Sequence, residues 1–239
     1  LYCYSPSHSV LYAININKKE ILREKKLNKG VAFIMMSPDE KFIYVFNEIM
    51  NYISFISPED LKELRSPAKL YMTPSFATIS LSGDRLFITC EKDESVIIFD
   101  TGSFIVKNVL KFKGQKPKYV AGNKDKAFIC LSAKHKIVAI DVKSGKVLKE
   151  LPVNGEPVNV LLNRKEPEKL YVLTGKPGSI IVFDIKYENM ENISVPQRFI
   201  GFDVSNSILS DNGFMYIIGE SSYKKNSSLG IYDISSGML

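Results

Sequence analysis

Two histidines, His8 and His135, are the side chains of this sequence best suited to bind a metal or a haem iron. A zinc site needs three or four converging ligands. These two histidines lie in what we interpret as different structural units, so we do not expect them to share an ion. We interpret both as exposed loop residues. Axial ligation of a haem by one of them is the alternative, and it would be the sharpest sign of an enzyme.

Four aspartates recur at a regular spacing: Asp100, Asp141, Asp184 and Asp233. Recurrent carboxylates can form calcium sites or an acid–base pair. Each of these, however, ends an apolar run just before a turn, where an aspartate accepts hydrogen bonds from turn amides. They also fall in different units, so we do not expect two of them within the roughly 5–10 Å that glycosidase chemistry needs. We interpret them as turn-forming residues.

Other familiar catalytic motifs are missing from the sequence. It contains no Gly-x-Ser-x-Gly elbow and no glycine-rich phosphate loop followed by lysine and serine or threonine. The three cysteines, Cys3, Cys90 and Cys130, lie in apolar runs and form no disulfide framework. We therefore predict no catalytic residue, no metal site and no cofactor.

The elements that position these residues follow from an internal repeat. Apolar triplets with a central aromatic residue recur along the chain, and the aromatic positions are separated by 41 to 45 residues. The triplets are Leu1-Tyr2-Cys3, Ile43-Tyr44-Val45, Leu86-Phe87-Ile88, Ala127-Phe128-Ile129, Leu170-Tyr171-Val172 and Met215-Tyr216-Ile217. A second apolar series, which ends at the recurrent aspartates, keeps nearly the same period.

Each unit has the pattern of four β-strands, which we call a to d. Strands b and c are apolar on both faces, as in 42–46 and 96–99, so both faces of each small sheet must be covered. Strand d alternates between polar and apolar residues, as in 146–151, which is typical of an outer rim. Sheets packed radially around an axis satisfy both conditions. The segment 19–29 is rich in Glu and Lys, but its phase in the repeat predicts strand d.

The predicted fold is therefore all-β, a single β-propeller domain over 1–239. We expect a partial blade at 1–30, four complete blades at about 31–73, 74–116, 117–156 and 157–201, and a partial blade at 202–239. Six blades are favoured for the whole ring, and seven are the alternative. The chain starts without a methionine or a signal peptide, so we expect it to be part of a longer polypeptide.

Several motifs resemble those of YVTN-type β-propeller repeats. They are the segment 37–47, the segment 95–100 followed by Val106, the segment 143–147, and the glycine–proline phrases 153–157 and 114–117. The Trp-Asp dipeptide of WD repeats is absent, since the sequence has no tryptophan. That family is known mostly from surface-layer and envelope proteins, with haem-binding and lactone-hydrolysing relatives. The resemblance implies an exported location at the periplasm or cell surface.

The loops that join strand b to c, and strand d to the next a, should gather on one face of a propeller. Loops on a rigid scaffold vary freely, so ligands of such folds usually bind there. The residues predicted to form this ligand-binding face are His8, Asn47, Asn51, Lys92, Asp93, Glu94, His135, Lys176, Glu220, Tyr223 and Lys224. The alternative is a set of ordinary solvated hairpin tips.

The function predicted from the sequence is a non-catalytic binding module or scaffold for a protein, peptide or glycan. The net charge of +6 is scattered and includes no basic block, so nucleic acid is not an expected partner. No apolar run approaches the length of a membrane span, so we expect no direct membrane insertion. Replacing Tyr223 and Lys224 with alanine should weaken partner capture. The alternative function is a cofactor-binding or lactonase-like propeller enzyme; the oligomeric state stays open.

Overall fold

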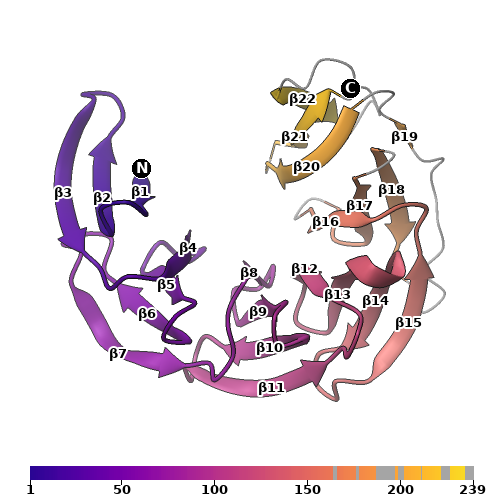
Figure 1. Ribbon diagram of the computed structural model, residues 1–239, viewed down its shortest axis with the longest axis horizontal. Coiled ribbons are helices and arrows are strands. Elements are labelled where there is room, and N and C mark those ends of the chain that lie inside the picture. The colour runs from indigo at the N-terminus through magenta and orange to yellow at the C-terminus, as the bar shows by residue number, and fades with distance from the viewer. Residues whose placement is uncertain are drawn as a thin grey trace.

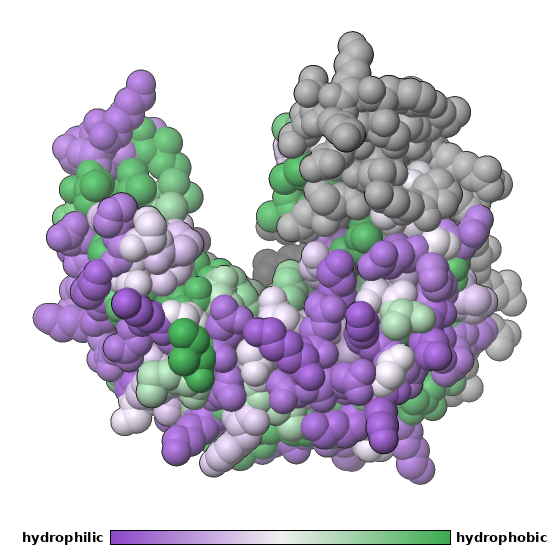
Figure 2. All heavy atoms as spheres, viewed as in Figure 1, coloured by the Kyte–Doolittle hydropathy of each residue, from purple (hydrophilic) through white to green (hydrophobic). Residues whose placement is uncertain are grey.

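The computed structural model of the chain is an arc of six antiparallel β-sheets (Figure 1). It describes residues 1–163, 166–175, 178–186, 197–198, 202–210, 212–221 and 227–234. We number the sheets 1 to 6 in chain order. The arc is open between sheet 1 and sheet 6, and the space-filling view shows the same opening (Figure 2). In each complete sheet strand a lies toward the axis and strand d at the outer rim.

Four of the sheets have four strands in the order a, b, c, d. Sheet 2 is β4 to β7 (Val31–Met36, Ile43–Asn47, Tyr52–Ile56, Glu63–Lys69), and sheet 3 is β8 to β11 (Phe76–Ile79, Arg85–Cys90, Ser95–Asp100, Ile105–Lys111). Sheet 4 is β12 to β15 (Pro117–Gly122, Lys126–Leu131, Lys136–Asp141, Val147–Pro152), and sheet 5 is β16 to β19 (Pro157–Leu162, Lys169–Thr174, Ser179–Asp184, Gln197–Arg198).

The sheets at the two ends of the arc have three strands each. Sheet 1 is β1 to β3 (Tyr2–Ser5, Val10–Asn15, Glu20–Lys26), and sheet 6 is β20 to β22 (Phe202–Leu209, Phe214–Ser221, Ser227–Asp233). The predicted all-β propeller of four-stranded units is confirmed. The expectation that the 19–29 segment holds a strand is also confirmed, by β3. Among the described residues, no helix has the length and apolar character to cross a membrane.

Apolar side chains from facing sheets form the core. Strands b and c are buried along nearly their whole length in sheets 2 to 5, whereas almost all residues in the strands d of sheets 1 to 4 are exposed or half-buried. Between sheets 4 and 5, for example, Phe128 and Ile137 pack with Val172 and Ile181. Burying each such side chain contributes roughly 1.5–3 kcal/mol, so these interfaces are the main source of stability.

The turns repeat as regularly as the strands. The residue just before strand c has a positive φ in four sheets, at Ser9, Asn51, Glu94 and His135. A residue one or two positions before strand d also has a positive φ, at Lys19, Leu61, Phe104 and Gly145. This left-handed residue allows a short hairpin to close with the twist of its strands. Most non-glycine residues are strained in it, because Cβ approaches the following carbonyl oxygen.

Three of the four recurrent aspartates, Asp100, Asp141 and Asp184, are turn-forming residues, as predicted. Asp100 Oδ1 accepts a hydrogen bond from the Ser103 amide at 2.6 Å, and Asp141 Oδ1 accepts one from the Ser144 amide at 2.6 Å. Asp184 Oδ1 accepts one from the Lys186 amide at 2.8 Å. The bond from the Ser103 amide is the chief cause of the lowered pKa of Asp100. The Ser144 hydroxyl and then the Ser144 amide are the chief causes of the lowered pKa of Asp141.

Candidate functional site

The two histidines lie in the b–c turns of sheets 1 and 4. His8 Nδ1 is 3.1 Å from Ser5 Oγ and 3.0 Å from Ser7 Oγ, so its turn already provides partners for this ring nitrogen. His135 follows a single 3₁₀ turn, Ser132–Lys134, and takes the left-handed conformation with a φ of 48°. In the described part of the chain, no three His, Cys, Asp or Glu side chains are grouped as a metal site. The structure thus does not bring the histidines together.

Asn47 and Asn51 shape the b–c turn of sheet 2. Asn47 was expected on the exposed face, but it is fully buried. Its amide nitrogen donates to the Lys29 carbonyl at 2.9 Å, and its Oδ1 accepts from the Ile49 and Met50 amides. Asn51 has a φ of 54°, which asparagine tolerates better than most residues. Both asparagines therefore position the turn, and Asn47 does so from inside the protein.

Lys92, Asp93 and Glu94 connect sheet 3 to its neighbour. Lys92 Nζ lies 3.5 Å from Glu48 Oε2 of the sheet 2 turn. Asp93 Oδ2 accepts a hydrogen bond from the Thr73 amide at 2.7 Å, within the loop that joins the two sheets. The Glu94 carbonyl accepts the Phe112 amide at 2.7 Å. These three residues hold the loops of this face in a fixed arrangement.

Three large apolar side chains on this face escaped the sequence analysis. Ile49 is 68% exposed, Met50 is 59% exposed and Tyr71 is 79% exposed. We call these three residues the 49–71 patch. The Leu70 amide donates to the Asn51 carbonyl at 2.8 Å, which places the Tyr71 turn against the Ile49–Met50 turn. Large apolar residues in turn segments are the sequence signal that could have identified the patch.

Two backbone features hold the 49–71 patch in place. Tyr71 has a φ of 62°, a conformation that costs a non-glycine residue roughly 1–2 kcal/mol. Gly30 has a φ of 86°, and a Cβ there would lie 2.5 Å from Ile49 Cγ1, so only glycine leaves room for Ile49. Strained and unusual backbone of this kind clusters at functional sites.

Four further residues were predicted to belong to this face. Lys176, Tyr223 and Lys224 lie outside the described residues. Glu220 belongs to β21, and only its backbone is described. The predicted part played by this C-terminal group stays a prediction.

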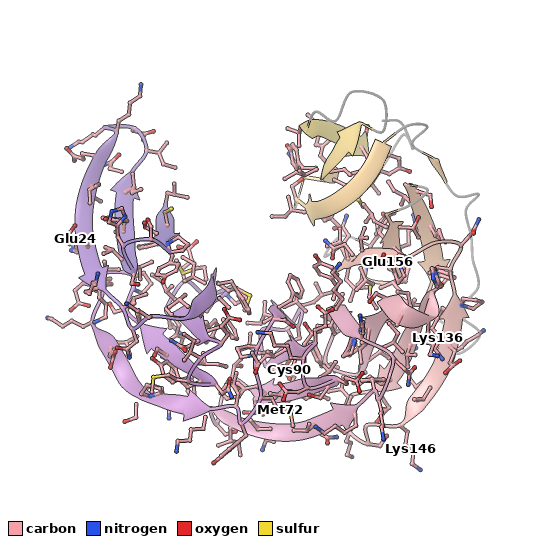
Figure 3. All side chains as sticks on the ribbon, viewed as in Figure 1. Glu24, Met72, Cys90, Lys136, Lys146 and Glu156 are labelled. Atoms are coloured by element: carbon pink, nitrogen blue, oxygen red, sulfur yellow. The ribbon has the colours of Figure 1, made fainter. Side chains whose placement is uncertain are left out.

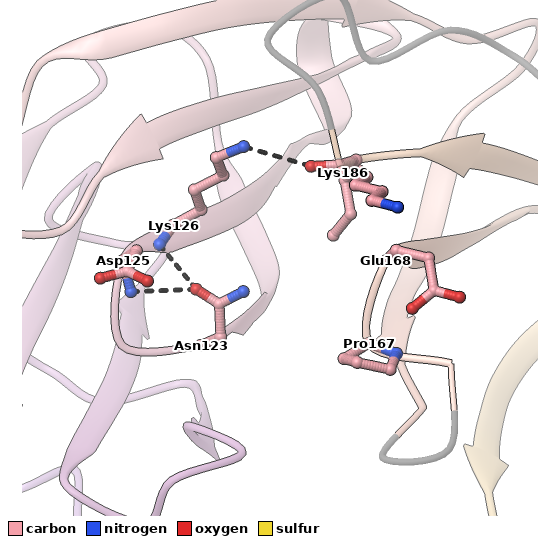
Figure 4. Close-up of a pocket in the computed structure, with 7 residues that line it drawn as sticks. Asn123, Asp125, Lys126, Pro167, Glu168 and Lys186 are labelled. Carbon is pink, nitrogen blue, oxygen red and sulfur yellow. Dashed lines mark hydrogen bonds between the residues drawn. The ribbon is translucent and has the colours of Figure 1, made fainter.

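Two surface cavities lie at the opposite ends of the sheets, beside the a–b and c–d turns. One, of about 540 Å³, lies between sheets 3 and 4 and carries the cations Arg85, Lys107, Lys124 and Lys143. Arg85 is neutralised by Asp100, with Nη1 and Oδ2 2.7 Å apart. A second cavity, of about 470 Å³, lies between sheets 4 and 5 beside the turn 123–126 (Figure 4).

A third cavity, of about 400 Å³, lies inside the arc, where strands a of sheets 3 to 6 meet. Apolar side chains such as Phe76, Ile79, Val160 and Leu162 line most of it. Figure 3 shows Lys146 at the outer rim of the arc and Glu156 farther toward its inner side. None of the three cavities contains the aligned nucleophile, base and oxyanion donors that would indicate acyl-transfer chemistry.

Comparison with known proteins supports the fold alone. No protein-family model matches the sequence, and no curated protein matches it. Among solved structures, the β-propeller domain of Cps50 (Swd1) from Myceliophteria thermophila superposes with a TM-score of 0.74 at 10% identity, over 100% of this chain and 84% of that one. A chain of the Mitotic Checkpoint Complex superposes with a TM-score of 0.75 at 11% identity, over 93% of this chain and 68% of that one.

An enzyme also shares the architecture. A catalytically inactive virginiamycin B lyase from Staphylococcus aureus, solved with quinupristin, has a TM-score of 0.71 at 17% identity, over 96% of this chain and 75% of that one. Structural neighbours thus include a β-propeller domain, a chain of a protein complex and a lyase, so the shared fold does not distinguish between functions. At these identities the likeness confirms the β-propeller and leaves membership of the YVTN-type family as a prediction.

Proposed function

We propose that this protein is a propeller that binds a protein or peptide partner on the face formed by the b–c and d–a loops. The observation that carries the proposal is the 49–71 patch, three large apolar side chains exposed on two turns that a backbone hydrogen bond joins. Exposed apolar side chains are common singly, but a group of them bordered by charge is typical of an interaction site.

The composition of the patch matches the centre of a protein interface. Tyrosine and methionine are enriched in interfaces, and tyrosine is among the residues that contribute most to binding energy. Glu48, Lys92 and Asp93 supply a charged border beside the patch. An apolar side chain of a partner could bury against Ile49 and Met50 while its polar neighbours meet the border. Aliphatic side chains offer little to a glycan, so we favour a protein or peptide.

Strain at Tyr71 supports the same reading. Tyr71 has a φ of 62° and is 79% exposed, so its side chain buries little surface that would offset the cost of its backbone conformation. Glycine would fit this position without strain. A side chain held there against its conformational preference is therefore better explained by a contact made outside the chain.

The experiment uses peptides selected on the chain itself. A random peptide library displayed on phage is selected against the immobilised protein, and the affinities of the selected peptides are measured by fluorescence polarisation. We expect selected peptides to carry an apolar anchor, and Tyr71→Ala to weaken their binding at least about 30-fold. Val147→Ala, a matched change at a residue 57% exposed on the outer rim, should leave affinity unchanged.

Two results would contradict the proposal. One is a set of peptides that bind wild type and Tyr71→Ala equally well. The other is binding that Lys124→Glu abolishes while Tyr71→Ala leaves it intact, because Lys124 lines the cavity at the opposite ends of the sheets. That second result would move the binding site to the a–b and c–d turns.

We also infer, from the YVTN-like motifs, an exported protein at the cell envelope. Fractionation of cells that produce the intact polypeptide tests this inference. Recovery in the periplasmic or surface fraction would support it, and recovery with the cytosolic marker would contradict it.

A further inference from the structure

An arginine and a phenylalanine fill the space between sheets 2 and 3 beside the c–d turns. The guanidinium carbon of Arg65 lies 3.7 Å from the centre of the Phe104 ring and 5.5 Å from that of the Phe55 ring. Arg65 belongs to strand d of sheet 2, and Phe104 belongs to the c–d turn of sheet 3. A cation stacked on aromatic faces in this way is a stabilising contact, and it leaves no large cavity at this interface among those described above.

The strand register identifies the equivalent of Arg65 one sheet further on. In sheet 2, Arg65 pairs with Phe55 of strand c; in sheet 3, Asn108 pairs with Ile98 at the same distance from the end of strand c. A short amide side chain therefore stands where the neighbouring interface has a long arginine.

The equivalent of Phe104 is also small. The c–d turn of sheet 4 has Gly145 as its residue with a positive φ, where sheet 3 has Phe104. A Cβ at Gly145 would lie 2.8 Å from Asn108 Nδ2, so the two positions face each other here as well. Asn108 Oδ1 accepts a hydrogen bond from the Val109 amide at 2.8 Å, and its Nδ2 can donate to a ligand. The cavity of about 540 Å³ between sheets 3 and 4 lies beside this pair, with Asn108 in its lining.

Three lysines from separate parts of the sequence line this cavity. Lys107 lies in β11 of sheet 3, Lys124 in the a–b turn of sheet 4 and Lys143 in the c–d turn of sheet 4. All three are exposed, and none of them forms an ion pair in the described part of the chain. Lys107 and Lys143 are the smallest of the causes that lower the pKa values of Asp100 and Asp141. Their charges thus remain available to a ligand.

The charge of Lys107 is particular to this sheet. Strand d of sheets 1 to 4 has a shift in its register with strand c, and the residue at the shift is left unpaired. That residue is a leucine about half exposed in three sheets, at Leu22, Leu64 and Leu148, and it is Lys107 in sheet 3. The lysine is therefore not a repeated feature of the outer rim.

The acidic residues near the cavity are largely paired within the protein. Asp84 Oδ1 accepts a hydrogen bond from the Ser80 hydroxyl at 2.8 Å. Arg85 Nη1 lies 3.4 Å from Asp84 Oδ2 and 2.7 Å from Asp100 Oδ2, so this guanidinium is shared between two carboxylates. Asp125 is the other carboxylate of the lining, and it is exposed. The three lysines thus face one remaining carboxylate, which favours an anionic ligand.

We propose that the cavity between sheets 3 and 4 binds a phosphate monoester, with the phosphate group held by Lys107, Lys124 and Lys143. A phosphate monoester carries nearly two negative charges at pH 7 and has three strong acceptor oxygens. A carboxylate has one charge and two oxygens, so it matches three ammonium groups less well. The volume of about 540 Å³ lies within the roughly 300–1,000 Å³ of small-molecule sites, so the group that carries the phosphate also has room. This proposal does not depend on the 49–71 patch, which lies at the other ends of the sheets.

Two probes test the site and distinguish the sources of the phosphate. Phenyl phosphate represents a small ester, and a phosphoserine peptide represents a phosphorylated protein; benzyl alcohol and the unphosphorylated peptide are their controls. Affinities are measured by isothermal titration calorimetry in a phosphate-free buffer, and the site is located by changes in the NMR amide signals of the protein.

We expect one-to-one binding of a phosphorylated probe, with signal changes in 107–108, 124–125 and 143–145. The probe that binds more tightly identifies the kind of molecule that carries the phosphate. Failure of both probes to bind would overturn the proposal. Binding of the control compounds as tightly as the phosphorylated probes would also overturn it, because the phosphate would then contribute nothing.

Substitutions of exposed lysines separate the site from a general attraction between opposite charges. Lys107→Gln and Lys124→Gln should each weaken binding at least about 10-fold, because each removes a hydrogen bond between charged groups. Lys113→Gln removes the same charge from an exposed lysine of sheet 3 outside the cavity, and it should leave the affinity unchanged. An equal loss in all three variants would contradict a built site.

A cavity-filling variant tests the geometry. Gly145→Phe places a ring where sheet 3 has Phe104, and Asn108→Ala removes the amide that the new Cβ would meet. The double variant should abolish binding of the phosphorylated probes, whereas Asn108→Ala alone should keep most of it. Circular dichroism shows whether the double variant folds; if it does not, the lysine variants decide the question. A folded double variant that binds like wild type would overturn the proposal.

Discussion

Replacing Tyr71 with glycine should change stability and binding in opposite directions. Tyr71 has a φ of 62° and is 79% exposed, so removing its ring gives up little buried surface. The left-handed conformation costs a non-glycine residue roughly 1–2 kcal/mol. Glycine avoids this cost but loses roughly 0.5–1 kcal/mol through the greater freedom of the unfolded chain. We therefore expect the variant to be about 0.5–1 kcal/mol more stable.

Urea unfolding followed by circular dichroism measures the stability change. For a domain of this size, the gain corresponds to an increase of roughly 1–4 °C in the melting temperature. The same variant should bind selected peptides at least about 30-fold more weakly, because an interface tyrosine contributes 2 kcal/mol or more.

Tyr71→Ala separates the two effects. Alanine keeps the Cβ and hence the backbone strain, so its stability should stay within about 0.5 kcal/mol of wild type while binding falls as it does for glycine. The reasoning would be refuted if Tyr71→Gly were less stable than wild type. It would also be refuted if the glycine variant bound peptides as tightly as wild type.

Three further predictions concern the fold. Lys19→Gly, at an exposed left-handed turn residue with a φ of 56°, should stabilise the protein by about 0.5–1 kcal/mol in urea unfolding, and a loss of stability would contradict the account of the turns. Phe128→Ala, at a side chain fully buried between sheets 4 and 5, should lower the free energy of unfolding by about 3–5 kcal/mol. A decrease below about 1 kcal/mol would mean that this interface is not packed as described. The Ser103 amide and Arg85 lower the pKa of Asp100 in the folded protein. Its carboxylate therefore stabilises the fold fully above the ordinary pKa of about 4, and this effect is lost as the pH falls through the folded-state pKa. Asp100→Asn should be less stable than wild type at pH 7, by a difference that shrinks below a pH of about 4; a constant difference would contradict the assignment.

The architecture was predictable because it repeats. A buried aromatic residue recurs in all four complete units and a turn-forming aspartate in three of them, so the same pattern appears several times within one chain. Asp100 and Asp141 could be assigned as turn residues from their place at the end of an apolar run, and the structure confirms this. The period can be read from the sequence because it depends only on which residue types are apolar and which favour turns.

The candidate site was harder to predict because exposure depends on how the loops fold. Asn47 is polar, as most surface residues are, yet the turn folds around its side chain and buries it. Ile49 and Met50 are apolar, as most core residues are, yet the same turn leaves their side chains exposed to solvent. Tyr71 is exposed in a turn whose backbone takes a conformation that its residue type disfavours. Large apolar residues in a turn segment are a sequence signal for the patch, but the burial of Asn47 and the backbone conformation of Tyr71 depend on how the turns fold.

Amide hydrogen exchange of the chain, with and without a selected peptide, tests most directly the claim that the loop face around the 49–71 patch binds a partner. The account predicts slower exchange in the segments 48–52 and 70–74 when peptide is bound, with little change at the a–b turns 82–84 and 123–125. Protection confined to those a–b turns, with none in 48–52 and 70–74, would contradict it.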